Sequence, residues 1–240
     1  MRDWTNSRAS SEQLVRRKVP KHELVHRQTR MFEKFRSVPE KGTGIEHYNV
    51  PLIVRRNVFW PCDDSIPLLE SVHIRAGESV LDVGTGTGVI GIFCALKGAG
   101  AVSAVDWNPD AISNAKENAA RNKVDAIFDA HHSDVFEAIE SNEKFDVIVA
   151  NLPMMNMKAR DVVESSIWDT DLHANEAFLS RVGQFVKPDG RIYMTQADFA
   201  AVDEVRSLAK EYGWELKTLR SRQTSAGDTF FALQLKRISA

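Results

Sequence analysis

The segment VLDVGTGTGVIGI, residues 80–92, constrains the fold more than any other stretch of the chain. An apolar run ends in an acid, Asp82, passes through Gly84, Gly86 and Gly88, and continues into a second apolar run. Glycine permits sharp turns and a close approach of ligand to backbone, and free N–H groups at a helix start favour electron-rich ligand groups. The segment therefore predicts a strand, a ligand-binding turn and a helix in succession.

From about residue 79 onward the chain repeats this alternation of short apolar runs with helical stretches. Such alternation is typical of a parallel sheet whose strands are joined by crossover helices. Strands are predicted over residues 79–84, 101–106, 126–134, 145–151 and 191–196. The sequence therefore predicts an α/β fold.

Local signals place the helices between these strands and the end of the sheet. Asn108 and Pro109 have the residue types of a helix start, and KPDG at 187–190 predicts the end of a helix that begins near Leu172. The stretches 214–223 and 228–238 flank the tight turn TSAGD. We therefore expect the sheet to end in an antiparallel hairpin.

Composition limits the classes of protein to which the chain can belong. With 43% hydrophobic and 27% charged residues it has the profile of a globular protein. It contains no run of eighteen apolar residues, and the first thirteen residues lack the apolar segment of a secretory signal. Cys62 and Cys94 are too few for a disulfide framework and have no CxxC neighbour. A cytoplasmic protein without a membrane span is expected.

The N-terminal region differs from the rest in charge. Residues 1–36 hold ten Lys/Arg against four Asp/Glu, whereas the remainder holds 21 against 29. We expect a helical arm or lid over residues 1–45, with a hinge at EKGTG (40–44), followed by one domain over residues 46–240. A basic arm suits a nucleic acid or an acidic partner, and it equally suits docking on the acidic body of its own chain.

Within this arm, His22, Glu23 and His26 match the HExxH pattern of zinc metalloproteases. Helical periodicity places Leu24, Phe32 and their apolar neighbours on one side and both histidines on the opposite side. The extended zinc motif would need glycine and histidine where the chain has Thr29 and Phe32. An ordinary polar helix face is favoured, and no metal is predicted.

A second acid supports a ligand site beside the glycine turn. Asp106 ends the next predicted strand, 20 residues after Gly86, where a carboxylate can accept hydrogen bonds from ribose hydroxyls. The glycines read GxGxG rather than the GxGxxG of dinucleotide sites, and the C-terminal hairpin is foreign to the dehydrogenase sheet. Together these features predict a nucleoside cofactor other than a dinucleotide.

Over residues 59–238 the sequence resembles the class I S-adenosylmethionine-dependent methyltransferases. The resemblance implies a Rossmann-like sheet of seven strands, mostly parallel with a C-terminal antiparallel hairpin, and S-adenosylmethionine as the cofactor. In that family the glycine loop holds the methionine part of the cofactor, the second acid binds the ribose, and the third strand end serves the adenine. The implied cofactor-binding residues are Ser65, Asp82, Gly84, Gly86, Asp106, Trp107, Asp134, Val135 and Asn151.

The fourth strand ends in VIVANLPM, residues 147–154, which is similar to the (N/D)PP(Y/F) motif of methyltransferases that act on amide or exocyclic amino nitrogens. That group includes the release-factor glutamine methyltransferases, and VFWPCDDSIPLLE (58–70) is similar to its Pro-x-x-Asp-Ser/Thr segment. The resemblance implies catalytic roles for Asn151, Leu152 and Pro153. Leu152 and Met154 depart from the motif, since they replace a proline and an aromatic residue.

Candidate substrate contacts lie on both sides of this motif. Tyr48 precedes the catalytic body, where related enzymes place lids or substrate-recognition elements. Met154, Trp168, Asp169 and Asp171 belong to or follow the motif, although a core role for Trp168 and a helix-cap role for Asp171 remain open. Methionine is a poorer stacking platform than an aromatic ring, which disfavours a flipped nucleobase as the substrate.

The function favoured by the sequence is N-methylation of a small amine or amide metabolite, or of a protein side-chain amide. A nucleic-acid N-methyltransferase that uses the basic arm is one alternative. A second alternative transfers or cyclises the aminocarboxypropyl group of the same cofactor and releases methylthioadenosine. A zinc hydrolase and a catalytically silent binding module are the remaining classes.

Overall fold

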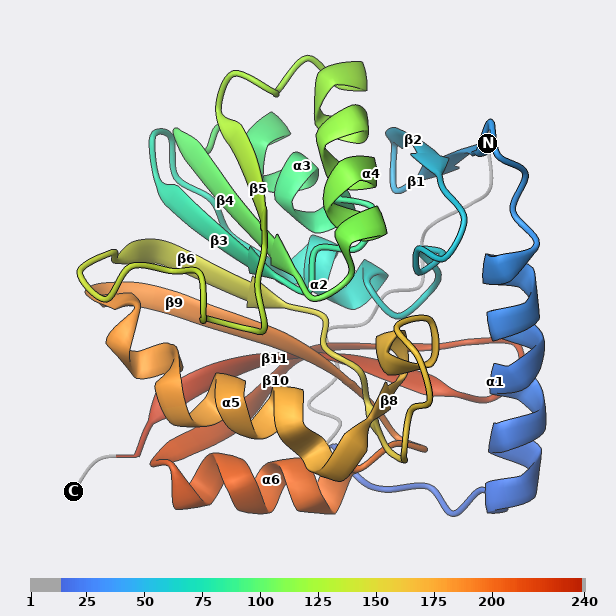
Figure 1. Cartoon of the computed structure of the whole chain (residues 1–240). Helices are drawn as coiled ribbons and strands as arrows, with labels where there is room; N and C mark the ends of the chain where they lie inside the picture. Colours follow the sequence, from blue (N-terminus) through green and yellow to red (C-terminus); the bar gives the residue numbers. More distant parts are fainter. Residues whose placement is uncertain (1–13, 239–240) are drawn as a thin grey trace.

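A seven-stranded sheet forms the centre of the molecule (Figure 1). The structure is a computed structural model that describes residues 14–238. The sheet strands are β3 (Ser79–Val83), β4 (Ala101–Asp106), β5 (Phe128–His132), β6 (Phe145–Ala150), β9 (Val186–Ala197), β10 (Trp214–Gln223) and β11 (Thr229–Arg237). They lie in the order β10-β11-β9-β6-β3-β4-β5. Strand β11 is antiparallel to both neighbours, whereas the other pairs are parallel, which confirms the predicted α/β sheet and its final hairpin.

Helices cover both faces of the sheet (Figure 1). They are α2 (Ile66–Ser71), α3 (Val89–Leu96) and α4 (Pro109–Arg121) on one face, and α5 (His173–Arg181) and α6 (Val202–Glu211) on the other. Successive residues of a strand point to opposite faces, so Val80 joins the core under α3 while Leu81 joins the core under α5. Both faces are therefore buried, as the continuous apolar runs of the sequence require.

A two-stranded hairpin that the sequence did not predict packs on α4. It consists of β1 (Thr43–His47) and β2 (Val50–Val54), joined by Tyr48 and Asn49 with φ of 50° and 62°. The fully buried Asn118 side chain accepts a bond from Ile53 N (2.8 Å) and donates to Ile53 O and Thr87 O (2.9 Å each). One amide thereby joins the hairpin, α4 and the glycine-rich loop.

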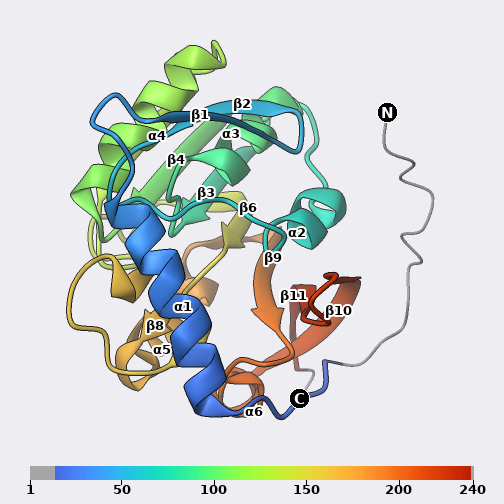
Figure 2. The same cartoon turned by 90° about the vertical axis from the view of Figure 1, so that its right-hand side faces the viewer.

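The N-terminal arm crosses the edge of the sheet as helix α1 (Lys21–Arg36), as Figure 2 shows. The predicted arm of residues 1–45 is helical only over this range; residues 43–45 already belong to β1, and residues 1–13 lie outside the described part. Phe32 and Phe35 are each 1% exposed and form a third hydrophobic cluster, the arm core, with Met154, Trp168 and their neighbours. Burial of these rings makes α1 an integral part of the folded body.

The KPDG residues (187–190) do not end a helix, as the sequence suggested, but lie inside strand β9. Helix α5 ends at Arg181, a 3₁₀ turn covers Val182–Gln184, and Lys187–Gly190 is an irregularity inside β9. Lys187 donates from Nζ to the Asp146 carboxylate (2.7 Å) on β6, which holds this segment against the sheet.

Before α5 the chain forms the short pair β7 (Met155–Asn156) and β8 (Trp168–Asp169) with 3₁₀ turns at Glu164–Ser166 and Thr170–Leu172. Within residues 14–238, no helix is both long and apolar enough to cross a membrane.

Candidate active site

A cavity of about 790 Å³ lies where the parallel strands end. Its walls come from the loops after β3, β4, β5 and β6, and residues of α1 line one side. Figure 2 shows α1 in front of these strand ends. Open α/β sheets bind ligands at the carboxyl ends of their strands. We refer to the part beside the β3–β5 loops as the cofactor half, and to the part lined by α1 and residues 154–171 as the acceptor half.

Asp82 is hydrogen-bonded to the glycine-rich loop and to the start of α3. Its Oδ2 accepts bonds from Thr85 Oγ1 (2.7 Å) and Gly91 N (3.0 Å), and its side chain is fully buried outside the cavity wall. Burial raises the pKa of this carboxyl to about 6, although the two hydrogen bonds oppose that rise. Gly84 and Gly86 do line the cavity, with φ of 75° and 55°. Asp82 thus shapes the loop, whereas the glycines face the ligand space.

Asp106 joins this loop to the end of β4. Its Oδ2 accepts from Gly86 N and its Oδ1 from Asn108 N, both at 2.8 Å, and burial raises the pKa of the carboxyl. Trp107 follows on the cavity wall with 55% of its surface exposed, and its ring centroid lies 5.6 Å from that of His132. A fixed carboxylate beside an exposed indole suits a ribose and its attached base.

Asp134 and Val135 complete the cofactor half, and the structure adds a partner that sequence reasoning missed. His173, at the start of α5, lines the same cavity and bonds through Nε2 to Asp134 Oδ2 at 2.8 Å. The Asp134 carboxylate raises the pKa of His173. The two residues lie 39 positions apart, so no local pattern signals the contact.

Asn151 stands where the two halves meet. Its Nδ2 donates to Asp64 Oδ2 (2.8 Å), and its Oδ1 accepts from Thr195 Oγ1 on β9. A Cβ placed on Gly84 would lie 3.6 Å from the Asn151 carbonyl oxygen, so the motif and the glycine loop are neighbours. Because an ionised carboxylate only accepts, Asp64 fixes which end of the Asn151 amide faces it.

The Pro-x-x-Asp-Ser/Thr segment thus reaches the cavity at Asp64 and Ser65. Both are buried, and burial foremost raises the pKa of Asp64. Cys62 donates to Asp64 Oδ1 from its thiol (3.1 Å) and its backbone N–H (3.3 Å). Ser65 Oγ lies 2.9 Å from His47 Nε2 on β1. The sequence singled out Ser65 from this segment, whereas the direct partner of Asn151 is Asp64.

The acceptor half is mainly apolar. Leu152, Pro153 and Met154 line it together with Trp168 and further apolar residues: Leu24, Met31, Phe59, Met155, Val162, Ile167, Phe199 and Phe230. The buried Trp168 indole donates from Nε1 to Gln28 Oε1 (2.6 Å) and meets Phe32 edge-on with ring centroids 5.1 Å apart. Trp168 therefore belongs both to the arm core and to the cavity wall.

The other three candidate substrate residues differ in where they lie. Asp169 lines the cavity but accepts bonds from Ala174 N and Asn175 N at the start of α5. Asp171 also lines the cavity and is exposed, with φ of 55°. Tyr48 lies at the hairpin turn, where its ring packs on Phe93 with centroids 5.5 Å apart, and it is not among the cavity residues.

Ion pairs fasten the arm beside the acceptor half. Asp228, at the turn between β10 and β11, pairs with both Arg17 and Arg27, and Arg17 Nε also lies 3.2 Å from Asp198 Oδ2. Arg27 and Asp228 both line the cavity. Basic residues of the arm, before and within α1, are thus bound in part to acids of the same chain.

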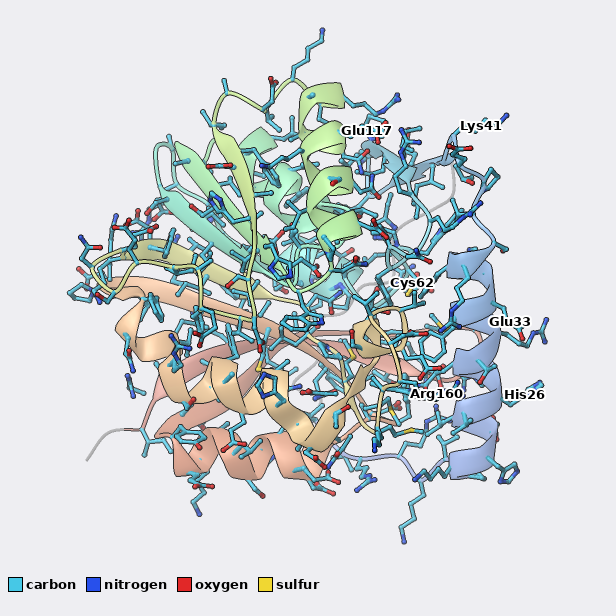
Figure 3. All side chains as sticks on the ribbon, viewed as in Figure 1. His26, Glu33, Lys41, Cys62, Glu117 and Arg160 are labelled. Atoms are coloured by element: carbon cyan, nitrogen blue, oxygen red, sulfur yellow. The ribbon has the colours of Figure 1, made fainter. Side chains whose placement is uncertain are left out.

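The histidines of HELVH lie away from this site. His22 and His26 are exposed, and Figure 3 shows His26 and Glu33 projecting outward from α1. No cluster of three His, Cys, Asp or Glu side chains able to hold a metal ion is present among residues 14–238. The outer histidines therefore have no metal site around them in this part of the chain.

Known proteins resemble this chain in both sequence and fold. Residues 63–160 match the family described as "Ribosomal protein L11 methyltransferase (PrmA)". The "Putative protein N5-glutamine methyltransferase" of Methanocaldococcus jannaschii is 32% identical over 179 residues, covering 72% of this chain and 89% of its own. A ribosomal protein L11 methyltransferase of Desulforamulus reducens is 44% identical over 79 residues, which is 33% of this chain and 25% of that relative.

The fold likeness extends beyond these relatives. A 16S rRNA N2 methyltransferase from T. thermophilus, solved in complex with AdoMet and guanosine, superposes with a TM-score of 0.58 and 21% identity over 82% of this chain and 50% of the other. The cavity fits such a cofactor, because bare glycines, a fixed carboxylate and an exposed indole follow one another along its wall. The chain belongs to the class I S-adenosylmethionine-dependent methyltransferases, the family of the protein glutamine and L11 methyltransferases, and is an enzyme that uses S-adenosylmethionine as its cofactor.

Proposed function

We propose that the enzyme methylates an amide nitrogen, with the side-chain amide of a protein glutamine as the acceptor. The observation that carries the proposal is the Asn151 amide, held between Asp64 and Thr195 on the cavity wall beside the glycine loop. The name of the Methanocaldococcus jannaschii relative supports the same acceptor class. The apolar acceptor half suits the aliphatic part of such a side chain.

Several residues of the cofactor half have positions that suit binding S-adenosylmethionine. We assign the ribose hydroxyls to Asp106, the adenine to Trp107, Asp134 and Val135, and the methionine end to Gly84, Gly86 and Ser65. When bound, the cofactor supplies a methyl group on a positively charged sulfur. Asp82 acts on this site through Thr85 and Gly91, since its own carboxylate lies behind the loop.

Asn151 and its successors orient the acceptor nitrogen. The Asn151 Oδ1 retains a second lone pair beyond its bond from Thr195, and the Leu152 carbonyl offers another acceptor. Two N–H bonds accepted there would turn the nitrogen lone pair toward the methyl donor. Positioning of this kind can supply about 7–11 kcal/mol of the barrier reduction. The new N–C bond forms as the S–C bond of the cofactor breaks, S-adenosylhomocysteine leaves, and the nitrogen releases one N–H proton to water. Pro153 shapes this turn, and Met154 contributes an apolar wall.

The test is turnover with a panel of acceptors. The purified enzyme is incubated with S-adenosylmethionine and glutamine-containing peptides, free glutamine, small amines or RNA, and the products are identified by mass spectrometry. We expect a methylated glutamine side chain and S-adenosylhomocysteine. Methylation of RNA alone, with binding that weakens steeply with salt, would replace the proposal by the nucleic-acid alternative. Methylthioadenosine as the product would select aminocarboxypropyl transfer.

A further inference from the structure

Gln28 of α1 is a buried polar residue in the apolar acceptor half. It is 5% exposed, lines the cavity, and accepts the Trp168 Nε1–H bond at 2.6 Å through its Oε1. Within residues 14–238 its Nε2 donates no hydrogen bond, and it is not one of the fully buried atoms of that range that lack a partner, so it is open to the cavity that Gln28 lines. The side chain therefore has two N–H donors that the described protein does not use.

Trp168 determines which end of the Gln28 amide is available. An indole N–H can only donate, so the oxygen of Gln28 must face it and the NH2 group must turn elsewhere. Phe32 packs edge-on against the same indole, and both rings are buried. The orientation of the Gln28 amide is thus fixed from the arm core.

A ligand that fills the cavity displaces water from this NH2 group, and a ligand oxygen within reach avoids the cost of leaving its donors unpaired. We propose, building on the proposed function, that Gln28 donates a hydrogen bond to an oxygen of the methyl acceptor. The acceptor class is then a molecule that carries a carbonyl oxygen together with the methylated nitrogen, as a carboxamide does. Gln28 is a residue that determines specificity for amides over amines.

The acids of the cavity support the same choice. A protonated amine would need a carboxylate partner, yet the buried acids Asp64, Asp169 and Asp228 are each engaged by groups of the protein. Asp228 pairs with two arginines, Asp169 accepts from the start of α5, and Asp64 accepts from Asn151. The buried acids around the acceptor half therefore provide no free carboxylate for an ammonium group, and Asp171, which also lines the cavity, is exposed to solvent.

The test uses a matched pair of probes, hexanamide and hexylamine, which share an apolar chain and a terminal nitrogen. Enzyme with 15N-labelled glutamine is saturated with S-adenosylhomocysteine and titrated with each probe, and the side-chain NH2 signals of Gln28 are followed by NMR. The signals are assigned by their loss in Gln28→Met. We expect hexanamide to shift them and hexylamine to leave them in place.

Variants separate recognition from folding. We expect Gln28→Met to bind hexanamide roughly tenfold more weakly, which corresponds to about 1.4 kcal/mol. Trp168→Phe keeps Gln28 but frees its orientation, so a smaller loss is expected. Thr29→Val is the matched control, because it removes a polar group from the next residue of α1, outside the cavity. Thermal melting checks that each variant folds.

The two proposals fail in different ways. Unshifted Gln28 signals up to the solubility limit of hexanamide, or equal hexanamide binding by Gln28→Met, would overturn the role of Gln28 whatever the turnover assay gives. A clear shift without methylation of any amide would leave that role standing and remove the proposed function. Methylation of glutamine peptides with the same kinetics in Gln28→Met as in the native enzyme would support the proposed function and remove the role of Gln28.

Discussion

Replacing Asp64 by asparagine keeps the size of the side chain and removes the charge that orients Asn151. In the native protein Asp64 Oδ2 accepts from Asn151 Nδ2 at 2.8 Å, and Thr195 supplies the hydrogen bond at the other end of the amide. The Thr195 hydroxyl can donate or accept, so it does not select an orientation by itself. In Asp64→Asn the two Cys62 donors hold the oxygen of the new amide, so its NH2 group faces Asn151 and no longer supports the native direction of the Asn151 amide.

The size of the effect follows from this one bond. A hydrogen bond to a charged group contributes about 1.5–3 kcal/mol, and about 1.4 kcal/mol on the barrier is a tenfold change in rate. We therefore expect Asp64→Asn to lower kcat by about ten- to hundredfold. Asp63→Asn is the matched control, since its carboxylate lies 3.5 Å from Arg222, is about half exposed and is not part of the cavity wall.

The pH profile distinguishes orientation from a purely structural loss. Burial raises the pKa of Asp64 above its usual range. Because the carboxylate form orients Asn151, kcat of the native enzyme should fall as pH falls through this raised pKa. Cys62 and His47 are the other titratable groups near the Asp64 carboxyl. Burial raises the pKa of the Cys62 thiol well above its usual range and lowers the pKa of His47. A lowered histidine pKa could also give an acid limb, and His47→Gln tests for that contribution.

Steady-state kinetics between acidic and neutral pH provide the measurement. We expect the acid limb in the native enzyme, Asp63→Asn and His47→Gln, and its absence in Asp64→Asn. Native kcat and an unchanged acid limb in Asp64→Asn, with a normal melting temperature, would refute the orienting role of Asp64.

Three further predictions concern the loop, the indole and the arm. The native pKa of about 6 for Asp82, against a usual 3.8, means that the folded state binds a proton more tightly. The free energy of unfolding should therefore fall by roughly 3 kcal/mol as the pH rises from about 4 to about 6. Denaturant unfolding of Asp82→Asn should lack that decline. Trp107→Ala should weaken S-adenosylhomocysteine binding in calorimetry by about ten- to hundredfold, if stacking contributes the about 1–3 kcal/mol seen for bases; unchanged affinity would remove its adenine role. Deleting residues 1–38 should abolish turnover and lower the melting temperature, because it uncovers Trp168; unchanged kinetics would exclude a part for the arm.

The sheet could be predicted from the sequence because buried parallel strands are nearly continuous apolar runs. The runs ending at Asp82 and Asp106 and the hairpin around TSAGD lie where they were expected. The hairpin β1–β2 was missed, since its turn is Tyr48 and Asn49 rather than a glycine pair, and such short strands carry little periodicity.

The contacts that define the candidate site had no local signal. Asp64 and Asn151 are 87 residues apart, and Gln28 and Trp168 are 140 apart. Pattern spacing placed Asn151 at a strand end, but only the folded chain brings its partners to it. The same holds for Asp82, where sequence spacing indicated a ligand contact and tertiary structure gives the loop a buried support.

The buried amide of Asn118 connects two segments that are distant in the sequence. Asn118 Oδ1 accepts a hydrogen bond from Ile53 N, while Asn118 Nδ2 donates to the carbonyl oxygens of Ile53 and Thr87. Aspartate or leucine could not replace it, because both lack N–H donors. Stiffening of the loop at Thr87 by a ligand would therefore reach β2, and the Ile53 amide should exchange its hydrogen more slowly with solvent. A peripheral hairpin would in this way report on occupancy of the catalytic pocket.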